Sequence, residues 1–132
     1  MQRPPRSPTP EFVSDRTPRP LMAPLLTFNL AREIDGLRAE VEYQNGHNAR
    51  TLIKHSEFRL VLIAFQAGAR IRQQTDQRIA LQPLSGHMRL ELPSEVVNLH
   101  PDQLLSLDRD QSHVIEAVED SACLLWIGWS KE

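Results

Sequence analysis

His113 is the first of the few side chains whose type and position indicate chemistry. It lies in an apolar run, Ser112 to Glu119, that is typical of a strand, where His113, Ile115 and Ala117 share one face. An inward imidazole can act as a general base or as a hydrogen-bond donor. The alternative, which we favour, is a pocket histidine that bonds a neighbour and does no chemistry, because a lone histidine seldom catalyses without an orienting partner.

Arg70, Arg72 and Arg78 form a second group of candidates. Arg70 and Arg72 are two residues apart, so on a strand they point the same way, and together they could hold a carboxylate or a phosphate. The alternative is a solvated edge strand whose charges discourage edge-to-edge pairing, with Asp76 paired to one of the arginines. The other histidines fall in turns or on a polar strand face without metal-ligand spacing: His47, His55, His87 and His100. The sequence contains no nucleophile elbow, phosphate-binding loop or dinucleotide fingerprint.

Composition excludes several classes of protein. The net charge of −2 over 132 residues gives no global reason to expect nucleic acid or an anionic membrane as a partner. Cys123 is the single cysteine, so no intramolecular disulfide can form, and a reducing, cytoplasmic location is expected. No apolar run approaches the roughly 20 residues of a membrane span, and the first twenty residues do not resemble a secretory signal.

Residues 1–22 are expected to form a disordered, partly polyproline II arm ahead of one domain over residues 23–132. The segment from Pro5 to Pro8 has weak PxxP character and would suit a docking peptide. The alternatives are an unstructured leader or a true start at Met22. The arm owes its character to Pro4, Pro5, Pro8, Pro10, Pro18 and Pro20, interspersed with Arg3, Arg6, Arg16 and Arg19.

The rest of the chain consists of short apolar runs separated by turn residues, which predicts an antiparallel all-β barrel or sandwich of about ten strands. A short helical turn is expected at 31–34, and no long helix. In the run from His87 to Leu92 the alternation is clean, with Met88, Leu90 and Leu92 on one face. Strands are expected near residues 25–30, 38–43, 49–54, 58–65, 79–82, 87–92, 96–99, 104–107, 112–119 and 122–129.

Two of these runs, 58–65 and 122–129, are apolar on both faces. Such a strand lies in the middle of a sandwich or has its second face covered by another subunit. Trp126 and Trp129 are three residues apart and so lie on opposite faces of the last strand. We therefore predict a homodimer formed by sheet packing, with one tryptophan in the core.

The stretch from Leu52 to Ile127 resembles the cupins, a family of small double-sheet β-barrels. Gly68 and Gly86 resemble the two glycines of the first cupin motif, and residues 99–105 resemble the turn that precedes the histidine of the second motif. His113 falls at the metal-ligand histidine of that second motif. The resemblance implies a single-domain, RmlC-like cupin: a double-stranded β-helix, or jelly-roll barrel, behind a disordered arm.

The resemblance also implies that most of the family's metal ligands are replaced in this chain. Counting from the two glycines puts Gln74 and Asp76 at the two histidines of the first motif and Ile79 at the acid, with a shift of one residue left open. Ala117 stands where an asparagine would follow His113. The residues expected to line the pocket are His113, Gln74, Asp76, Ile79, Arg70, Arg72 and Ala117.

A tight transition-metal site needs several imidazole or carboxylate donors, so no cofactor is predicted. If a divalent transition metal binds, its ligands would be His113, Asp76 and Gln74. We predict a non-catalytic barrel that binds a small-molecule or anionic ligand or has a structural role. The alternative is a metal-dependent cupin oxygenase or isomerase, and a third possibility is an effector-sensing module that acts beside a partner protein.

Overall fold

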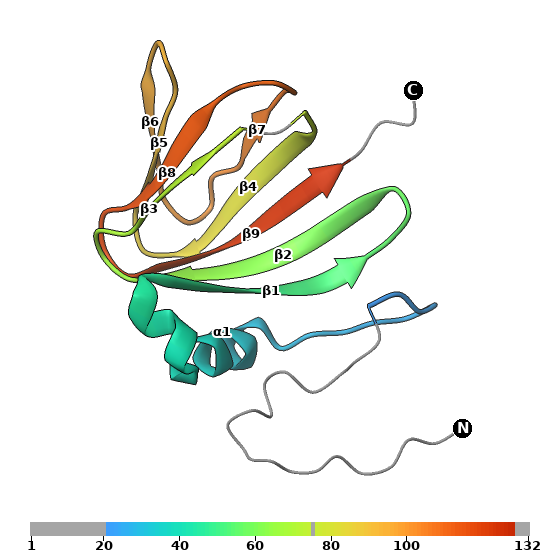
Figure 1. Ribbon diagram of the computed structural model, residues 1–132. Helices are drawn as coiled ribbons and strands as arrows, with labels where there is room; N and C mark the ends of the chain where they lie inside the picture. Colours follow the sequence, from blue (N-terminus) through green and yellow to red (C-terminus); the bar gives the residue numbers. More distant parts are fainter. Residues whose placement is uncertain (1–20, 75, 129–132) are drawn as a thin grey trace.

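The computed structural model describes residues 21–74 and 76–128, which form nine strands preceded by a helix (Figure 1). The predictions for residues 1–20 and for Trp129 lie outside the described residues. The helical elements are α1 (Leu30–Ala39) and the short 3-10 helix η2 (Val41–Asn45). The strands are β1 (His47–Lys54), β2 (Phe58–Phe65), β3 (Arg70–Gln73), β4 (Arg78–Ser85), β5 (Met88–Glu91), β6 (Val96–Leu99), β7 (Leu105–Leu107), β8 (His113–Ala117) and β9 (Ser121–Gly128).

The strands form two antiparallel sheets that enclose one apolar core. The larger sheet has the order β1-β2-β9-β4-β7, and the smaller has the order β3-β8-β5-β6. Figure 1 shows the smaller sheet on one side of the larger sheet and α1 on the other. The all-β prediction is confirmed. The core between the sheets is built from Ile63, Phe65, Ile79, Leu81, Met88, Leu90, Leu99, Ile115, Ala117, Cys123 and Leu125.

Strand alternation sets which side chains enter this core. On β5, Met88 and Leu90 are fully buried, whereas Arg89 and Glu91 are partly exposed. On β8, His113 and Ile115 are buried in the same direction, as the sequence predicts. Because successive strand residues point to opposite faces, these two patterns establish which face of the smaller sheet is inward.

The turn between β4 and β5, where the chain passes from the larger sheet to the smaller one, requires a glycine. Gly86 has a φ of +86°, in the left-handed region that favours glycine. A Cβ at this position would meet Ser121 Oγ and Asp120 O. Ser121 Oγ also accepts a hydrogen bond of 3.1 Å from the backbone N–H of His87. The packing of this turn against β9 therefore leaves no room for a side chain.

The segment before β1 differs from the prediction. Residues 25–30 form no strand, and in place of a short turn at 31–34 and a strand near 38–43 the chain forms α1 and then η2. Asn29 caps α1, because its side-chain oxygen accepts a hydrogen bond of 3.1 Å from the backbone N–H of Arg32. Leu30, Ile34 and Leu37 recur at helical spacing and place an apolar stripe toward the sheet. Tertiary packing of that stripe outweighs the helix-weakening Gly36.

A buried ionic cluster fastens α1 to β1. Arg50 Nη1 lies 2.6 Å from Glu33 Oε1, and Arg50 Nη2 lies 3.1 Å from Glu40 Oε2. Asn48 Nδ2 donates to Glu40 Oε1 at 2.8 Å and to the carbonyl oxygen of Leu37 at 3.0 Å. The side chain of Arg50 is 8% exposed, so these bonds form away from water, where they are strong.

The apolar second face of β2 is covered by the chain's own helix. Leu60, Leu62 and Ala64 of β2 pack with Leu124 of β9 against Leu37 of α1. The sequence argument for a homodimer assumed that a second subunit would cover this face. That argument loses part of its basis, and the homodimer stays a prediction.

Candidate functional site

His113 begins β8 and is 1% exposed. Its Nδ1 lies 3.0 Å from the carbonyl oxygen of Gln111, and its Nε2 lies 3.1 Å from Gln73 Oε1. Both partner atoms are acceptors, whereas a neutral imidazole carries a single N–H. A neutral His113 therefore donates to Gln111, and the Gln73 amide turns so that its NH₂ group donates to Nε2. In this arrangement, both ring nitrogens are engaged within the fold.

Gln73, rather than Gln74, is the residue that meets His113, and the sequence analysis missed it. Gln73 on β3 is the direct register partner of His113 on β8. A shift of one residue in the count from Gly68, which the sequence leaves open, would place Gln73 rather than Gln74 at this position. The signal that could have found it is strand parity, because Ile71 packs inward and Gln73 follows it two residues later.

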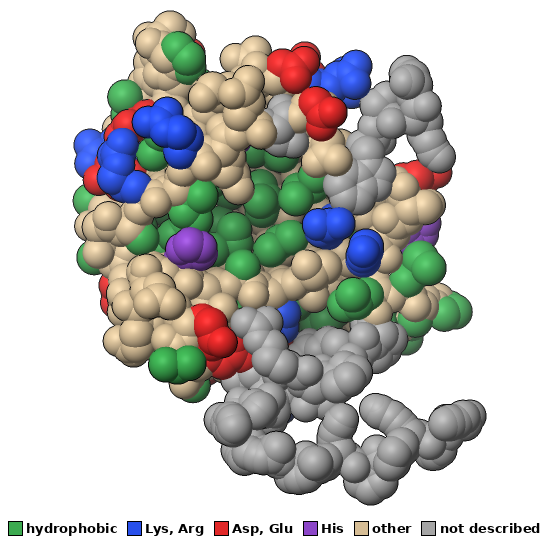
Figure 2. All heavy atoms as spheres, viewed as in Figure 1, with side chains coloured by type: hydrophobic (Ala, Val, Ile, Leu, Met, Phe, Trp, Pro, Cys, Tyr) green, Lys and Arg blue, Asp and Glu red, His purple; other side chains and the backbone are tan. Residues whose placement is uncertain are grey.

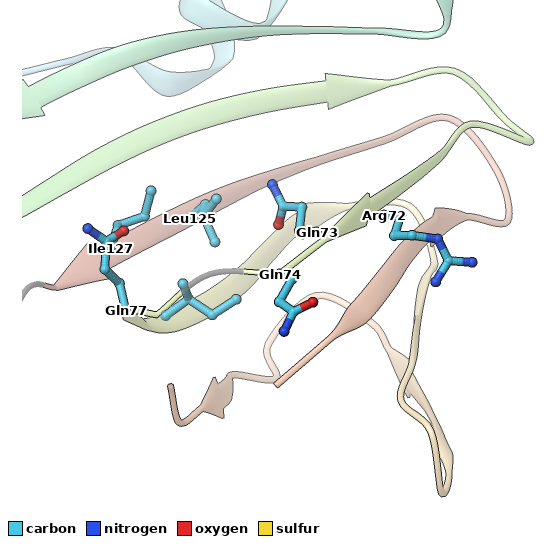
Figure 3. Close-up of a pocket in the computed structure, with 7 residues that line it drawn as sticks. Arg72, Gln73, Gln74, Gln77, Leu125 and Ile127 are labelled. Carbon is cyan, nitrogen blue, oxygen red and sulfur yellow. The ribbon is translucent and has the colours of Figure 1, made fainter. Parts of the chain in front are cut away.

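A cavity of about 350 Å³ lies beside this pair. Its floor is apolar, formed by Ile79, Leu125 and Ile127, and the space-filling view shows apolar side chains at the base of a hollow between the sheets (Figure 2). The remaining lining residues are polar: Arg72, Gln73, Gln74 and Gln77. Figure 3 shows Gln73 directed toward Leu125 and Gln77 lying beside Ile127. The cavity thus combines an apolar floor with a rim of amide groups.

Three of the predicted pocket residues line this cavity, in different ways. Ile79 is buried in the floor. Gln74 is exposed and points away from the side on which Gln73 lies (Figure 3). Arg72 is exposed as well, and its guanidinium is turned away from Leu125 and Ile127 (Figure 3). Only Ile79 therefore belongs to the enclosed part of the cavity.

Two other predicted pocket residues lie elsewhere. Asp76 is exposed and is not among the residues that line the cavity. Ala117 is fully buried in the core opposite Met88, at the other end of β8 from His113. The two ends of β8 lie roughly 13 Å apart, at about 3.3 Å per residue, so Ala117 lies apart from His113 and does not line this cavity.

The guanidinium of Arg70 is engaged with carboxylates of the smaller sheet, an arrangement closer to the solvated-edge alternative than to an anion site in the pocket. Arg70 Nη1 and Nη2 lie 2.9 Å and 3.1 Å from the two carboxylate oxygens of Glu91, and Nη1 lies 3.3 Å from Glu116. The hydrogen bond from Arg70 lowers the pKa of Glu91 and raises that of Arg70 itself. Arg89 Nε lies 3.5 Å from Glu116 Oε1, which extends the group of ion pairs. Figure 2 shows basic and acidic side chains mixed on this part of the surface.

The structure places the candidate metal ligands in different surroundings. Within residues 21–74 and 76–128, no three His, Cys, Asp or Glu side chains come close enough together to hold a metal ion. His113 bonds Gln73 and Gln111, while Gln74 and Asp76 are exposed. The three ligands suggested by the resemblance are therefore not arranged around a common point.

The remaining histidines have turn and surface positions, as expected. The rings of His87 and His100 stack with centroids 4.3 Å apart, and His87 Nε2 lies 2.9 Å from Asn98 Oδ1. Parallel stacked rings direct their nitrogen lone pairs side by side rather than at one ion. Of the described helices, none is long and apolar enough to cross a membrane.

Comparison with solved structures identifies the architecture. A cupin superfamily protein from Desulfitobacterium hafniense superimposes with a TM-score of 0.62 over 65% of this chain and 80% of its own, at 15% identity. The chain has the cupin fold. The conserved SPY1581 protein of unknown function from Streptococcus pyogenes gives a TM-score of 0.68 over 86% of this chain and 95% of its own, at 18% identity.

Ectoine synthase from P. lautus shares this cupin fold as well, with a TM-score of 0.58 over 63% of this chain and 64% of its own, at 18% identity. No protein-family model and no curated protein matches the sequence. At these identities the likeness establishes the fold, which is confirmed as the cupin barrel that the glycines and His113 predict.

Proposed function

We propose that this cupin barrel binds a small molecule and does not act through a catalytic metal. The observation that carries the proposal is the cavity of about 350 Å³ between β3, β4 and β9. Its volume lies within the ~300–1,000 Å³ of small-molecule sites, which combine apolar walls with a few placed polar groups. Ile79, Leu125 and Ile127 supply the apolar wall, and glutamine side chains supply the polar groups.

The lining also indicates the class of ligand. Each glutamine amide offers both donors and an acceptor, so the rim suits a hydroxyl, an amide or a single carboxylate. Of the lining residues, Arg72 is the one with a charge, and it is exposed, which favours a neutral or singly charged ligand over a polyanion. We therefore expect a compact amphipathic molecule such as a hydroxy acid or a sugar derivative.

His113 supports a binding role rather than a catalytic one. It bonds a backbone carbonyl and an amide, and neither group carries the negative charge with which an orienting carboxylate stabilises an imidazolium. The ring is 1% exposed, and its contact with the side chain of Gln73 holds that amide in place. Its role is thus to fix the orientation of a cavity side chain.

A thermal-unfolding screen tests the proposal. Hydroxy acids, monosaccharides and simple amides are added at fixed ionic strength, and Fe²⁺, Mn²⁺, Ni²⁺ and Zn²⁺ are added separately. A ligand present at about 100 times its Kd stabilises the native state by about 2.7 kcal/mol. The stabilisation should be lost in Gln73→Ala and kept in Gln44→Ala, a matched change at an exposed glutamine of η2.

Two results would contradict the proposal. One is a screen in which the organic compounds leave the unfolding temperature unchanged. The other is near-stoichiometric transition metal in the purified protein that disappears in His113→Ala, because that result would favour the metal-dependent enzyme.

A further inference from the structure

Three aromatic rings form a contiguous patch on the outer face of the larger sheet, outside the apolar cluster that α1 covers. His55 and Phe58 stack with centroids 5.5 Å apart and an interplanar angle of 15°, and Phe58 and Trp126 lie 6.1 Å apart. Trp126 is 37% exposed and His55 is exposed. We call His55, Phe58 and Trp126 the aromatic patch. Large apolar rings left open to water in this way commonly mark a contact surface.

The chain enters the structure next to this patch. The carbonyl oxygen of Leu21 accepts a hydrogen bond of 2.8 Å from the backbone N–H of Lys54, the residue before His55. Lys54 pairs with Arg59 of β2, and Arg59 pairs with Ile127 of β9, the neighbour of Trp126. Three strand spacings of about 4.8 Å therefore separate the anchored Leu21 from the strand that carries Trp126, or about 14 Å, whereas β2, which carries Phe58, is about 10 Å away.

The sequence immediately before Leu21 has the composition that aromatic surfaces bind. It reads Pro18-Arg19-Pro20, and three residues in polyproline II conformation span about 9 Å. Proline-rich segments dock on aromatic grooves because their conformation is already restricted, so little entropy is lost on binding. An arginine guanidinium also stacks favourably on an indole. Glu57, exposed in the turn between His55 and Phe58, adds an opposite charge for Arg19.

We propose that residues 18–20 of the same chain dock on the aromatic patch. The tether at Leu21 gives the segment an effective concentration of about 1 mM or more, so even weak docking is populated. A second copy of the chain is less suited to this surface, because a stable interface buries about 800 Å² on each partner. Three aromatic side chains bury about 150–250 Å² each when fully covered, and here Phe58 is already half-buried.

Nitroxide labelling of the full-length chain tests the docking. A label at Thr17→Cys sits one residue from the segment, and Cys123, fully buried, stays unlabelled in the native protein. The amide signals of His55 and Phe58 and the indole N–H signal of Trp126 should lose about half of their intensity or more, since docking with a Kd near 1 mM is about half populated. Exposed residues of α1 such as Arg32 and Asp35 should lose less.

Matched proline variants separate docking from mere tethering. Pro18→Ser with Pro20→Ser should restore the signals of the aromatic patch, whereas Pro5→Ser with Pro8→Ser, the same change farther along the arm, should leave the broadening in place. Equal broadening in both double variants would overturn the proposal. Broadening that appears only when isotope-labelled chains are mixed with separately nitroxide-labelled chains would also overturn it, because the arm of a second copy would then be the occupant.

Discussion

The ionic cluster under α1 gives the sharpest prediction about stability. Arg50→Met removes the guanidinium and leaves the carboxylates of Glu33 and Glu40, whose side chains are 14% and 5% exposed, without this partner. Breaking a buried ion pair from one side costs about 3–5 kcal/mol, because the remaining charge stays desolvated. For a domain of this size each kcal/mol lowers the unfolding temperature by roughly 3–5 °C, so we expect a loss of roughly 9–25 °C.

The matched control is Arg70→Met, the same change in a pair on the outer face. The side chain of Arg70 is 48% exposed, so water screens this pair and its loss should lower stability far less. Both variants are unfolded in urea at pH 7 and followed by circular dichroism. Adding Glu40→Gln to Arg50→Met should recover part of the loss, because one buried charge is then removed. Equal destabilisation by Arg50→Met and Arg70→Met would refute the reasoning.

Three further predictions concern single groups. The hydrogen bond from Arg70 lowers the pKa of Glu91 below its ordinary 4.5, so this carboxylate stabilises the fold fully above that pH and loses its contribution as the pH falls through the folded-state pKa. In a plot of the urea midpoint against pH, Glu91→Gln should therefore make the decrease at acid pH less steep. Burial raises the pKa of Cys123 from 9.0 to about 12, so the thiol should resist alkylation in the native state at pH 8. Between about pH 9 and 12 the thiol ionises in the unfolded chain before it does so in the folded one, so stability should fall over this range, and Cys123→Ala should abolish that fall. Gly86→Ala should destabilise the fold by more than about 2 kcal/mol, because its Cβ collides with backbone, whereas Gly68→Ala, at a φ of +90° but facing open space, should cost only about 1 kcal/mol. Similar urea midpoints for the two variants would contradict the packing argument.

The barrel was predictable because its signals are local. Alternation over Met88–Glu91 and the parity of β8 follow directly from the order of residues, and glycine marks the turn at Gly86. The helix was missed although Asn29 is a good cap, because Gly36 interrupts the pattern and because the stabilising partners, Arg50 and Asn48, lie on a strand farther along the chain.

The site was predictable in part. The inward direction of His113 follows from its own strand, but its partner Gln73 depends on register, and a shift of one residue in a strand exchanges the two faces. Counting from Gly68 leaves that shift open. The ion pairs of Arg70 could not be predicted from its neighbours in the sequence, because Glu91 and Glu116 lie on two other strands.

The position of β9 has a consequence for how the molecule is made. It is the last of the strands in residues 21–128, yet it pairs with β2 on one side and β4 on the other. A ribosome-bound chain that ends before Ser121 lacks the centre of its larger sheet, so the strands already synthesised have no complete sheet to join. We therefore expect the larger sheet to form only after β9 has been synthesised, with termination before Ser121 yielding aggregation-prone fragments rather than a smaller barrel.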